Sequence, residues 1–151
     1  MTSEAGEAAD RPLDVSELIA TLARHEVEYV VIGGVATQVH GHRRTTMDLD
    51  VTPDPSPENL RRLGAALTEL EARPGGFTRH GRLHILKEPK GARAFTEMRE
   101  SALVVDLDGN EVAIVSLDDL IRMKRAAGRP SDLDDIAALT EVERRGLEGE
   151  P

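Results

Sequence analysis

Apolar residues recur at helical spacing along much of the chain. Between Pro57 and Glu71, leucines return every three or four residues, which is the pattern of an amphipathic helix. Asp14 and Ser116 precede similar stretches as candidate N-caps, and Gly128 closes the second of them. We therefore expect helices at about 15–25, 35–40, 57–71, 95–101 and 117–127, and a last helix from residue 131 onward.

Short runs rich in β-branched residues predict the strands. Residues 28–32 form one such run and end at a glycine pair, and residues 47–52 alternate between polar and apolar before three prolines. Asp108-Gly109-Asn110 lies between two apolar runs, as is typical of a β-hairpin. The predicted strands are 28–32, 47–52, 82–86, 103–107 and 111–115, with a basic loop at 87–94.

Strands and helices are mixed without strict alternation, which favours an α+β fold in which helices flank a small mixed β-sheet. The length of 151 residues suits one domain. We place this domain at residues 12–143. Flexible tails are expected at residues 1–11 and 144–151, where apolar periodicity is absent.

Composition narrows the classes of function. The chain has no cysteine, which excludes disulfides, thiolate metal sites and cysteine nucleophiles. Its 19 basic and 28 acidic residues give a net charge of −9, which argues against bulk affinity for nucleic acid but not against a local basic groove. With Tyr29, Phe77 and Phe95 as the whole aromatic content, no base-stacking surface is expected. No signal-like or membrane-spanning apolar stretch is found, so we expect a cytoplasmic protein without a membrane partner.

Candidate chemistry gathers between residues 33 and 50. Gly33-Gly34 stands between a predicted strand and a helix, where glycine lets the backbone approach a ligand and a helix start favours phosphate. Asp48 and Asp50 alternate on one strand, so both carboxylates face the same side. A divalent cation such as Mg²⁺ would remove their mutual repulsion. Taken separately, the glycines fit a plain turn equally well, and the acids fit a solvated strand face.

The combined spacing is more specific than either motif. Gly33-Gly34, Gly41, Arg44, Thr45, Asp48 and Asp50 together resemble the nucleotidyltransferase superfamily, which has the polymerase-β-like fold. The resemblance implies a nucleotide site that includes Gly33, Gly34, Arg44 and Thr45. It also implies that Asp48 and Asp50 are catalytic residues that hold Mg²⁺. The segment resembles the branch that contains toxins of type IV toxin–antitoxin systems.

A second segment, KRAAGRPSDLDDI, resembles the C-terminal K…R..D..D element of this superfamily. The resemblance implies that Lys124 and Arg129 contact nucleotide phosphates, and that Asp132 and Asp135 belong to the site or support it. The toxin branch often has lysine before the first of these acids, where this chain has Ser131. The resemblance covers about residues 28–140.

One position departs from the family pattern. A later strand usually supplies a third carboxylate, and at the expected place this chain has His84. His84 is a candidate general base or metal ligand, and it is equally a sign of lost activity. Asp106 and Asp108 are alternative acids, although Asp108 lies in the predicted turn. Arg82 and its basic neighbours add positive charge before His84.

The resemblance implies a magnesium-dependent enzyme that moves a nucleoside monophosphate from a nucleoside triphosphate to an RNA (tRNA-like) or protein acceptor. A cognate antitoxin or toxin is then an expected partner. The alternative is a catalytically silent module of the same fold that binds a nucleotide or a protein partner. Residues 40–44 are either a basic rim of the site or a solvated loop, and residues 87–93 are either a mobile lid or a solvated loop.

Overall fold

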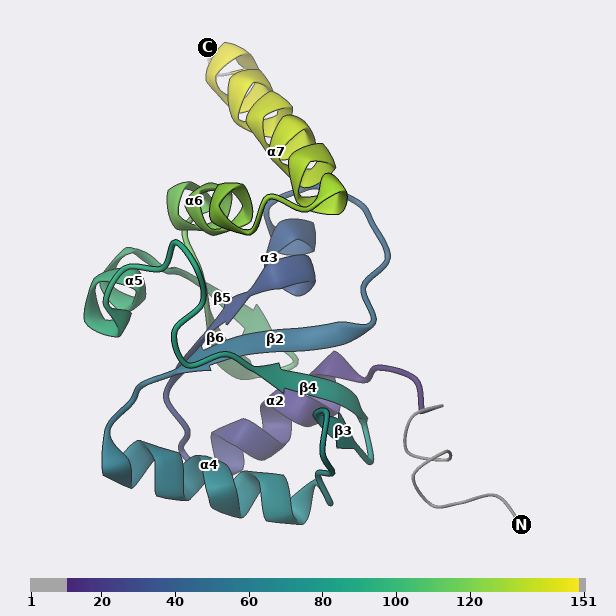
Figure 1. The fold of residues 1–151 in the computed structure, drawn as a ribbon, viewed down its shortest axis with the longest axis vertical. Coiled ribbons are helices and arrows are strands. Elements are labelled where there is room, and N and C mark those ends of the chain that lie inside the picture. Colours follow the sequence, from purple (N-terminus) through teal and green to yellow (C-terminus); the bar gives the residue numbers. More distant parts are fainter. Residues whose placement is uncertain (1–10, 150–151) are drawn as a thin grey trace.

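The computed structural model describes residues 11–149 of the chain. The predicted N-terminal tail, residues 1–11, falls outside this range except for Arg11. Helices and strands follow one another from Val15 to the last described residue (Figure 1). No helix within residues 11–149 is long and apolar enough to cross a membrane.

Within residues 11–149, six strands form a single mixed sheet, which confirms the predicted α+β class. Their spatial order is β3-β4-β2-β1-β6-β5. The β1/β6 and β2/β4 pairs are parallel, and the remaining neighbours are antiparallel. The strands are β1 (Tyr29–Ile32), β2 (Asp48–Pro53), β3 (Phe77–Thr78), β4 (Gly81–Ile85), β5 (Leu103–Leu107) and β6 (Asn110–Ile114). The short strand β3 was not predicted, because two residues carry no readable alternation.

Two of the helices begin at the predicted polar caps, Asp14 and Ser116, and a third begins at Ser56, which was not predicted as a cap. The side chains of Asp14, Ser56 and Ser116 accept hydrogen bonds from backbone N–H groups three residues later, at the starts of α2 (Val15–Arg24), α4 (Pro57–Glu69) and α6 (Leu117–Ala127). The other helices are α3 (Gly33–Val39), α5 (Phe95–Ser101) and α7 (Pro130–Gly149). In Figure 1, α2 and α4 lie below the sheet, and α3, α6 and α7 lie above it.

The central strands carry the apolar core. Val31 of β1, Leu49 of β2 and Leu83 of β4 are buried, and they pack with Leu18 and Leu22 of α2. Since alternate residues of a strand face opposite sides, burial of Leu49 and Leu83 turns their polar neighbours to the other face of the sheet. The core therefore determines which face of β2 and β4 carries charged groups.

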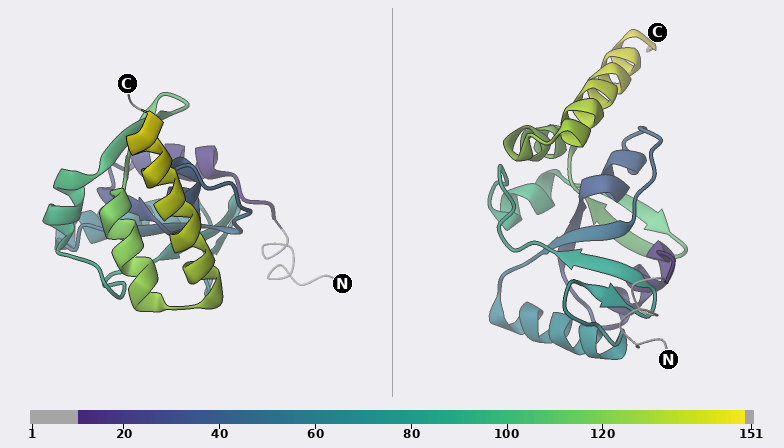
Figure 2. Two further views of the ribbon diagram at one scale, coloured as in Figure 1. Left: turned by 90° about the horizontal axis from the view of Figure 1, so that it is seen from above. Right: turned by 45° about the vertical axis from the view of Figure 1, so that its right-hand side comes forward.

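The C-terminal helix differs from the expectation. We placed the end of the domain at residue 143, but α7 continues to Gly149 and projects from the body of the molecule (Figure 2). Its first half packs beside α6, to which it is joined through Gly128 in the left-handed conformation. Residues 144–149 are thus helical.

Candidate active site

Two neighbouring strands place four polar side chains together. In the parallel pairing of β2 with β4, Asp48 is opposite Arg82 and Asp50 is opposite His84. Arg82 Nη1 donates a hydrogen bond to Asp48 Oδ2 at 3.0 Å. His84 Nδ1 lies 3.1 Å from Asp50 Oδ1. Each carboxylate of the predicted pair is therefore matched with one side chain of the adjacent strand.

Asp48, Asp50 and His84 have the geometry of a possible cation site. One potential ligand atom from each residue lies within 4.8 Å of the others. All three are partly buried. Burial raises the pKa of Asp50 above its ordinary value, and although His84 opposes this effect, the charge of Asp48 adds to it. A divalent cation accepts carboxylate oxygen and imidazole nitrogen ligands and would relieve the repulsion between the two acids, so these residues fit such an ion.

The glycine pair has two different packing roles. Gly33 has a φ of +69°, and a Cβ atom added to it would lie 2.1 Å from Asp50 Oδ2. Glycine is therefore required both by the backbone conformation and by the close approach of the carboxylate. A Cβ on Gly34 would instead lie 2.5 Å from Thr46 Oγ1. Gly33 thus faces the acidic pair, whereas Gly34 lets α3 pack against the segment before β2.

A pocket of about 480 Å³ opens beside the acidic pair. One wall consists of Gly33, Asp48, Asp50, Arg82 and His84. The opposite wall comes from α6, the start of α7 and the loop after β4, and its polar members are Lys90, Lys124, Arg129 and Asp132. Apolar side chains also line the pocket, among them Leu86, Leu120 and Met123. The pocket therefore combines an acidic edge, a candidate cation site, with basic groups suited to phosphate.

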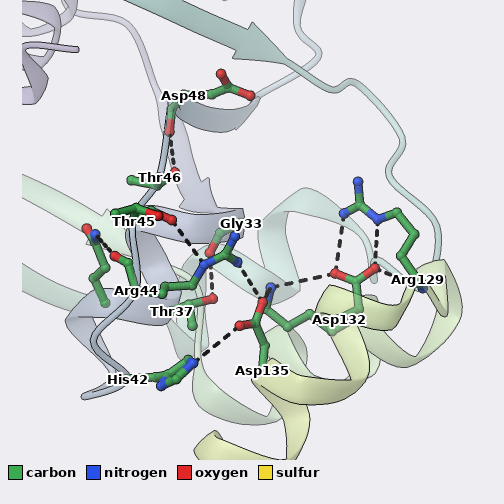
Figure 3. Close-up of polar contacts among 12 residues, drawn as sticks. Gly33, Thr37, His42, Arg44, Thr45, Thr46, Asp48, Arg129, Asp132 and Asp135 are labelled. Atoms are coloured by element: carbon green, nitrogen blue, oxygen red, sulfur yellow. Dashed lines mark hydrogen bonds and ion pairs between the residues drawn. The ribbon is translucent and has the colours of Figure 1, made fainter. Parts of the chain in front are cut away.

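Lys124 is held by the acids of α7. Its Nζ donates a hydrogen bond to Asp135 Oδ2 at 2.8 Å and lies 3.8 Å from Asp132 Oδ1. The side chains of Lys124 and Asp135 are only 7% and 4% exposed. Arg44 Nη1 also donates to Asp135 Oδ2 at 2.7 Å, and His42 Nε2 lies 3.5 Å from Asp135 Oδ1 (Figure 3). Asp135 thus joins the basic segment before β2 to the pocket lysine.

Asp132 has a parallel role toward Arg129. Its carboxylate accepts hydrogen bonds from the backbone N–H of Arg129 and from its guanidinium, at 3.1 and 2.8 Å (Figure 3). Burial opposes ionisation of Asp132, but the bonds from Arg129 outweigh it and lower the pKa of this carboxyl. The aspartates of the second segment therefore bind basic side chains and do not belong to the candidate cation site of Asp48, Asp50 and His84.

The structure separates the other predicted site residues into two groups. Arg44, Thr45 and Gly34 lie beside the site but do not line the pocket, and Arg44 is engaged with Asp135. The alternative acids are distant, because Asp106 and Asp108 belong to the β5–β6 hairpin at the far edge of the sheet from β4. Asp106 Oδ1 accepts a hydrogen bond from the backbone N–H of Gly109 in the hairpin turn, at 2.8 Å. Asp108 accepts one from Ser16.

The loop after β4 is anchored to α6. Arg93 Nε and Nη2 each donate a hydrogen bond to the Asp119 carboxylate at 2.7 Å. A Cβ on Gly91 would lie 2.8 Å from Ala126 Cβ and 2.9 Å from the carbonyl oxygen of Arg122. Asp119 lies in the first turn of α6, and its pairing with Arg93 was not predicted. The contacts favour a fixed wall of the pocket over a mobile lid.

Comparisons with known proteins give a consistent result. The model of a family described as "Nucleotidyltransferase of unknown function (DUF6036)" matches residues 11–145. The search of curated proteins finds no match.

Several solved structures have a similar fold. An antigenic nucleotidyltransferase-like protein from Paracoccidioides brasiliensis aligns with a TM-score of 0.60 at 18% identity, over 83% of this chain and 72% of that one. The lincosamide antibiotic adenylyltransferase LnuA, in its lincomycin-bound form, aligns with a TM-score of 0.60 at 17% identity, over 87% of this chain and 99% of LnuA. ANT(2")-Ia in complex with adenylyl-2"-tobramycin aligns with a TM-score of 0.52 at 16% identity, over 85% of this chain and 90% of ANT(2")-Ia. At these identities the likeness shows a shared fold.

Proposed function

Because the chain belongs to the nucleotidyltransferases of unknown function (DUF6036), we propose that it transfers a nucleoside monophosphate from a nucleoside triphosphate to an RNA or protein acceptor. The observation that carries this proposal is the pocket itself. It places Asp48, Asp50 and His84 opposite Lys124 and Arg129, which are the charges needed at the two ends of a bound triphosphate.

The reaction is an in-line displacement at the α-phosphorus. An oxygen of the acceptor hydroxyl forms a bond to this phosphorus, the bond to the bridging oxygen of the β-phosphate breaks, and pyrophosphate leaves with that electron pair. His84 is suited to take the hydroxyl proton. In the tautomer that donates from Nδ1 to Asp50, the Nε2 atom has a free lone pair.

Asp48 and Asp50 would hold the divalent cation, and we propose Mg²⁺ as that cation. When bound, this ion stabilises the charge that develops on the phosphate oxygens. Gly33 has no side chain to block the approach of a triphosphate to the acidic pair. Lys124 and Arg129 line the opposite wall and would balance the remaining phosphate charge.

Two observations bear on the acceptor. The resemblance to the type IV toxin branch favours RNA (tRNA-like) or protein as the acceptor, and a cognate antitoxin or toxin as a partner. The structural neighbours LnuA and ANT(2")-Ia are named for antibiotic substrates instead. An acceptor screen should therefore contain total RNA, total protein, a lincosamide and an aminoglycoside. Transfer of label to RNA or protein supports our proposal, and transfer to the antibiotics alone refutes the proposed acceptor class.

Calorimetric titration of magnesium nucleoside triphosphate tests the site. We expect the wild-type protein to bind the complex and the double variant Asp48→Ala/Asp50→Ala to bind it at least ~10-fold more weakly, because the cation loses both carboxylate ligands. Asp134→Ala is a suitable control, since Asp134 is exposed and its substitution also removes a carboxylate, one charge where the double variant removes two. Equal affinities of the wild type and the double variant would refute the role of the acidic pair.

A catalytically silent, nucleotide-binding module is the second candidate, and His84 in place of the expected third acid favours it. Turnover of α-labelled nucleotide with the acceptor screen separates the two. Release of pyrophosphate that is abolished by Asp48→Asn supports the enzyme. Tight nucleotide binding without turnover in every acceptor pool supports the silent module.

A further inference from the structure

Arg82 is held in the site by three different groups. Its Nη1 donates to Asp48 Oδ2 at 3.0 Å, and its Nε donates to the carbonyl oxygen of Gly75 at 2.6 Å. Its Cζ lies 5.7 Å from the centre of the Phe77 ring, within the range of a cation–π contact. Because these contacts come from β2, from the turn before β3 and from β3 itself, the guanidinium has a defined position beside the pocket.

The charge of Arg82 changes what the acidic pair can bind. Two-cation sites for phosphoryl or nucleotidyl transfer hold their ions about 3.5–4 Å apart, bridged by shared carboxylates. Here one oxygen of Asp48 already accepts a hydrogen bond from a guanidinium, and the place opposite Asp50 is taken by His84, whose imidazole carries no negative charge. A second divalent ion at Asp48 would have to displace Arg82 or lie next to a fixed positive charge.

We infer that Arg82 takes the place of one of two divalent cations, so that the site binds a single cation per chain and Arg82 supplies the second positive charge toward the phosphates. This inference rests on the proposed function, since it concerns the same acidic pair. A purely structural role, in which Arg82 only joins β3 to β2, would leave the number of bound cations unchanged on substitution.

The test counts bound Mn²⁺, which prefers the same oxygen ligands as Mg²⁺ and has a spectroscopic signal when free. Protein is mixed with an equal amount of a nucleotide analogue that has a methylene between the α- and β-phosphorus atoms and therefore cannot turn over. Both concentrations are far above the dissociation constant, so that neither free protein nor free nucleotide contributes to the count. We expect one Mn²⁺ per nucleotide complex in the wild type and two in Arg82→Gln. Arg82→Lys retains the charge and should bind one. Arg79→Gln removes an exposed charge directly after β3, and this variant should also bind one Mn²⁺.

Two Mn²⁺ ions in the wild-type complex would overturn the inference, and this count does not depend on any variant being folded. A single ion in a folded Arg82→Gln complex would overturn it as well. Mn²⁺ titration without nucleotide tests the proposed function separately. If Asp48→Ala/Asp50→Ala binds Mn²⁺ as well as the wild type does, the acidic pair is not the cation site. If the double variant loses Mn²⁺ binding but the wild-type nucleotide complex holds two ions, only the role of Arg82 is refuted.

Discussion

Replacing Asp135 with asparagine tests whether the buried acids of α7 hold the pocket lysine in place. The substitution keeps the shape of the side chain and removes its charge. Lys124 loses a 2.8 Å charge-assisted hydrogen bond, and Arg44 loses one of 2.7 Å. Both α6 and the segment before β2 are joined to α7 through this carboxylate, so the substitution weakens the attachment of the C-terminal helix.

The burial of each partner sets the expected cost. Breaking a buried ion pair by removing one partner costs about 3–5 kcal/mol, because the other charge stays buried without compensation. Lys124 is only 7% exposed, but Asp132 stays 3.8 Å from its Nζ and supplies part of the lost compensation. Arg44 is 32% exposed and can be solvated, which reduces its share. We therefore expect Asp135→Asn to lower the free energy of unfolding by about 3 kcal/mol.

Urea denaturation followed by circular dichroism measures this loss, and a melting curve should show a decrease of roughly 6–12 °C for a domain of this size. Asp134→Asn is the matched control, because the neighbouring Asp134 is exposed on the same helix. If the two variants differ by less than about 0.5 kcal/mol, the range of ordinary surface substitutions, the buried carboxylate does not stabilise the fold as argued.

Three further substitutions test the packing. Gly33→Ala should displace Asp50 and so lower the affinity for Mn²⁺, and its positive φ should reduce the free energy of unfolding by about 1–2 kcal/mol. The control Gly64→Ala, in the open middle of α4, should leave Mn²⁺ affinity unchanged in the titration and leave stability unchanged or raised in thermal melts. Asp119→Asn should lose stability at neutral pH. Its arginine partner lowers the pKa of Asp119, so this contribution is present above the ordinary aspartate pKa and lost as the pH falls through the lowered value; unfolding curves of wild type and variant should therefore converge in acid. Asn59→Ala should cost about 2–3 kcal/mol in urea, because three hydrogen bonds to backbone groups are lost, and a cost under 0.5 kcal/mol would contradict this count.

Alternation and capping were sufficient to predict much of the fold. The buried positions of β2 alternate with Asp48 and Asp50, so the sequence alone places both acids on one face. Asp14 before α2 and Ser116 before α6 mark helix starts that the structure confirms. These signals are local, and they depend only on which residues can satisfy the first backbone N–H groups of a helix or alternate across a strand.

The partners of the site residues could not be predicted in this way. Which side chain of β4 lies opposite Asp48 depends on the register between two strands separated by the whole of α4 and β3. Arg82 was therefore visible only as positive charge in the sequence. The pairing of Arg93 with Asp119 likewise joins a loop to a helix, and a helix-start acid gives no sign of a distant partner.

Burial and partners explain why two similar acid pairs have different roles. Asp48 and Asp50 are partly exposed on a strand, where Arg82 pairs with Asp48 and His84 lies beside Asp50, so that the two acids share one arginine. Asp132 and Asp135 are nearly fully buried on a helix, where arginine and lysine neutralise both. A cation is favourable only where carboxylate charge is left uncompensated, so the strand pair is the one suited to an ion. The helix pair is already neutralised by Arg129 and Lys124, and these ion pairs position the basic wall of the pocket.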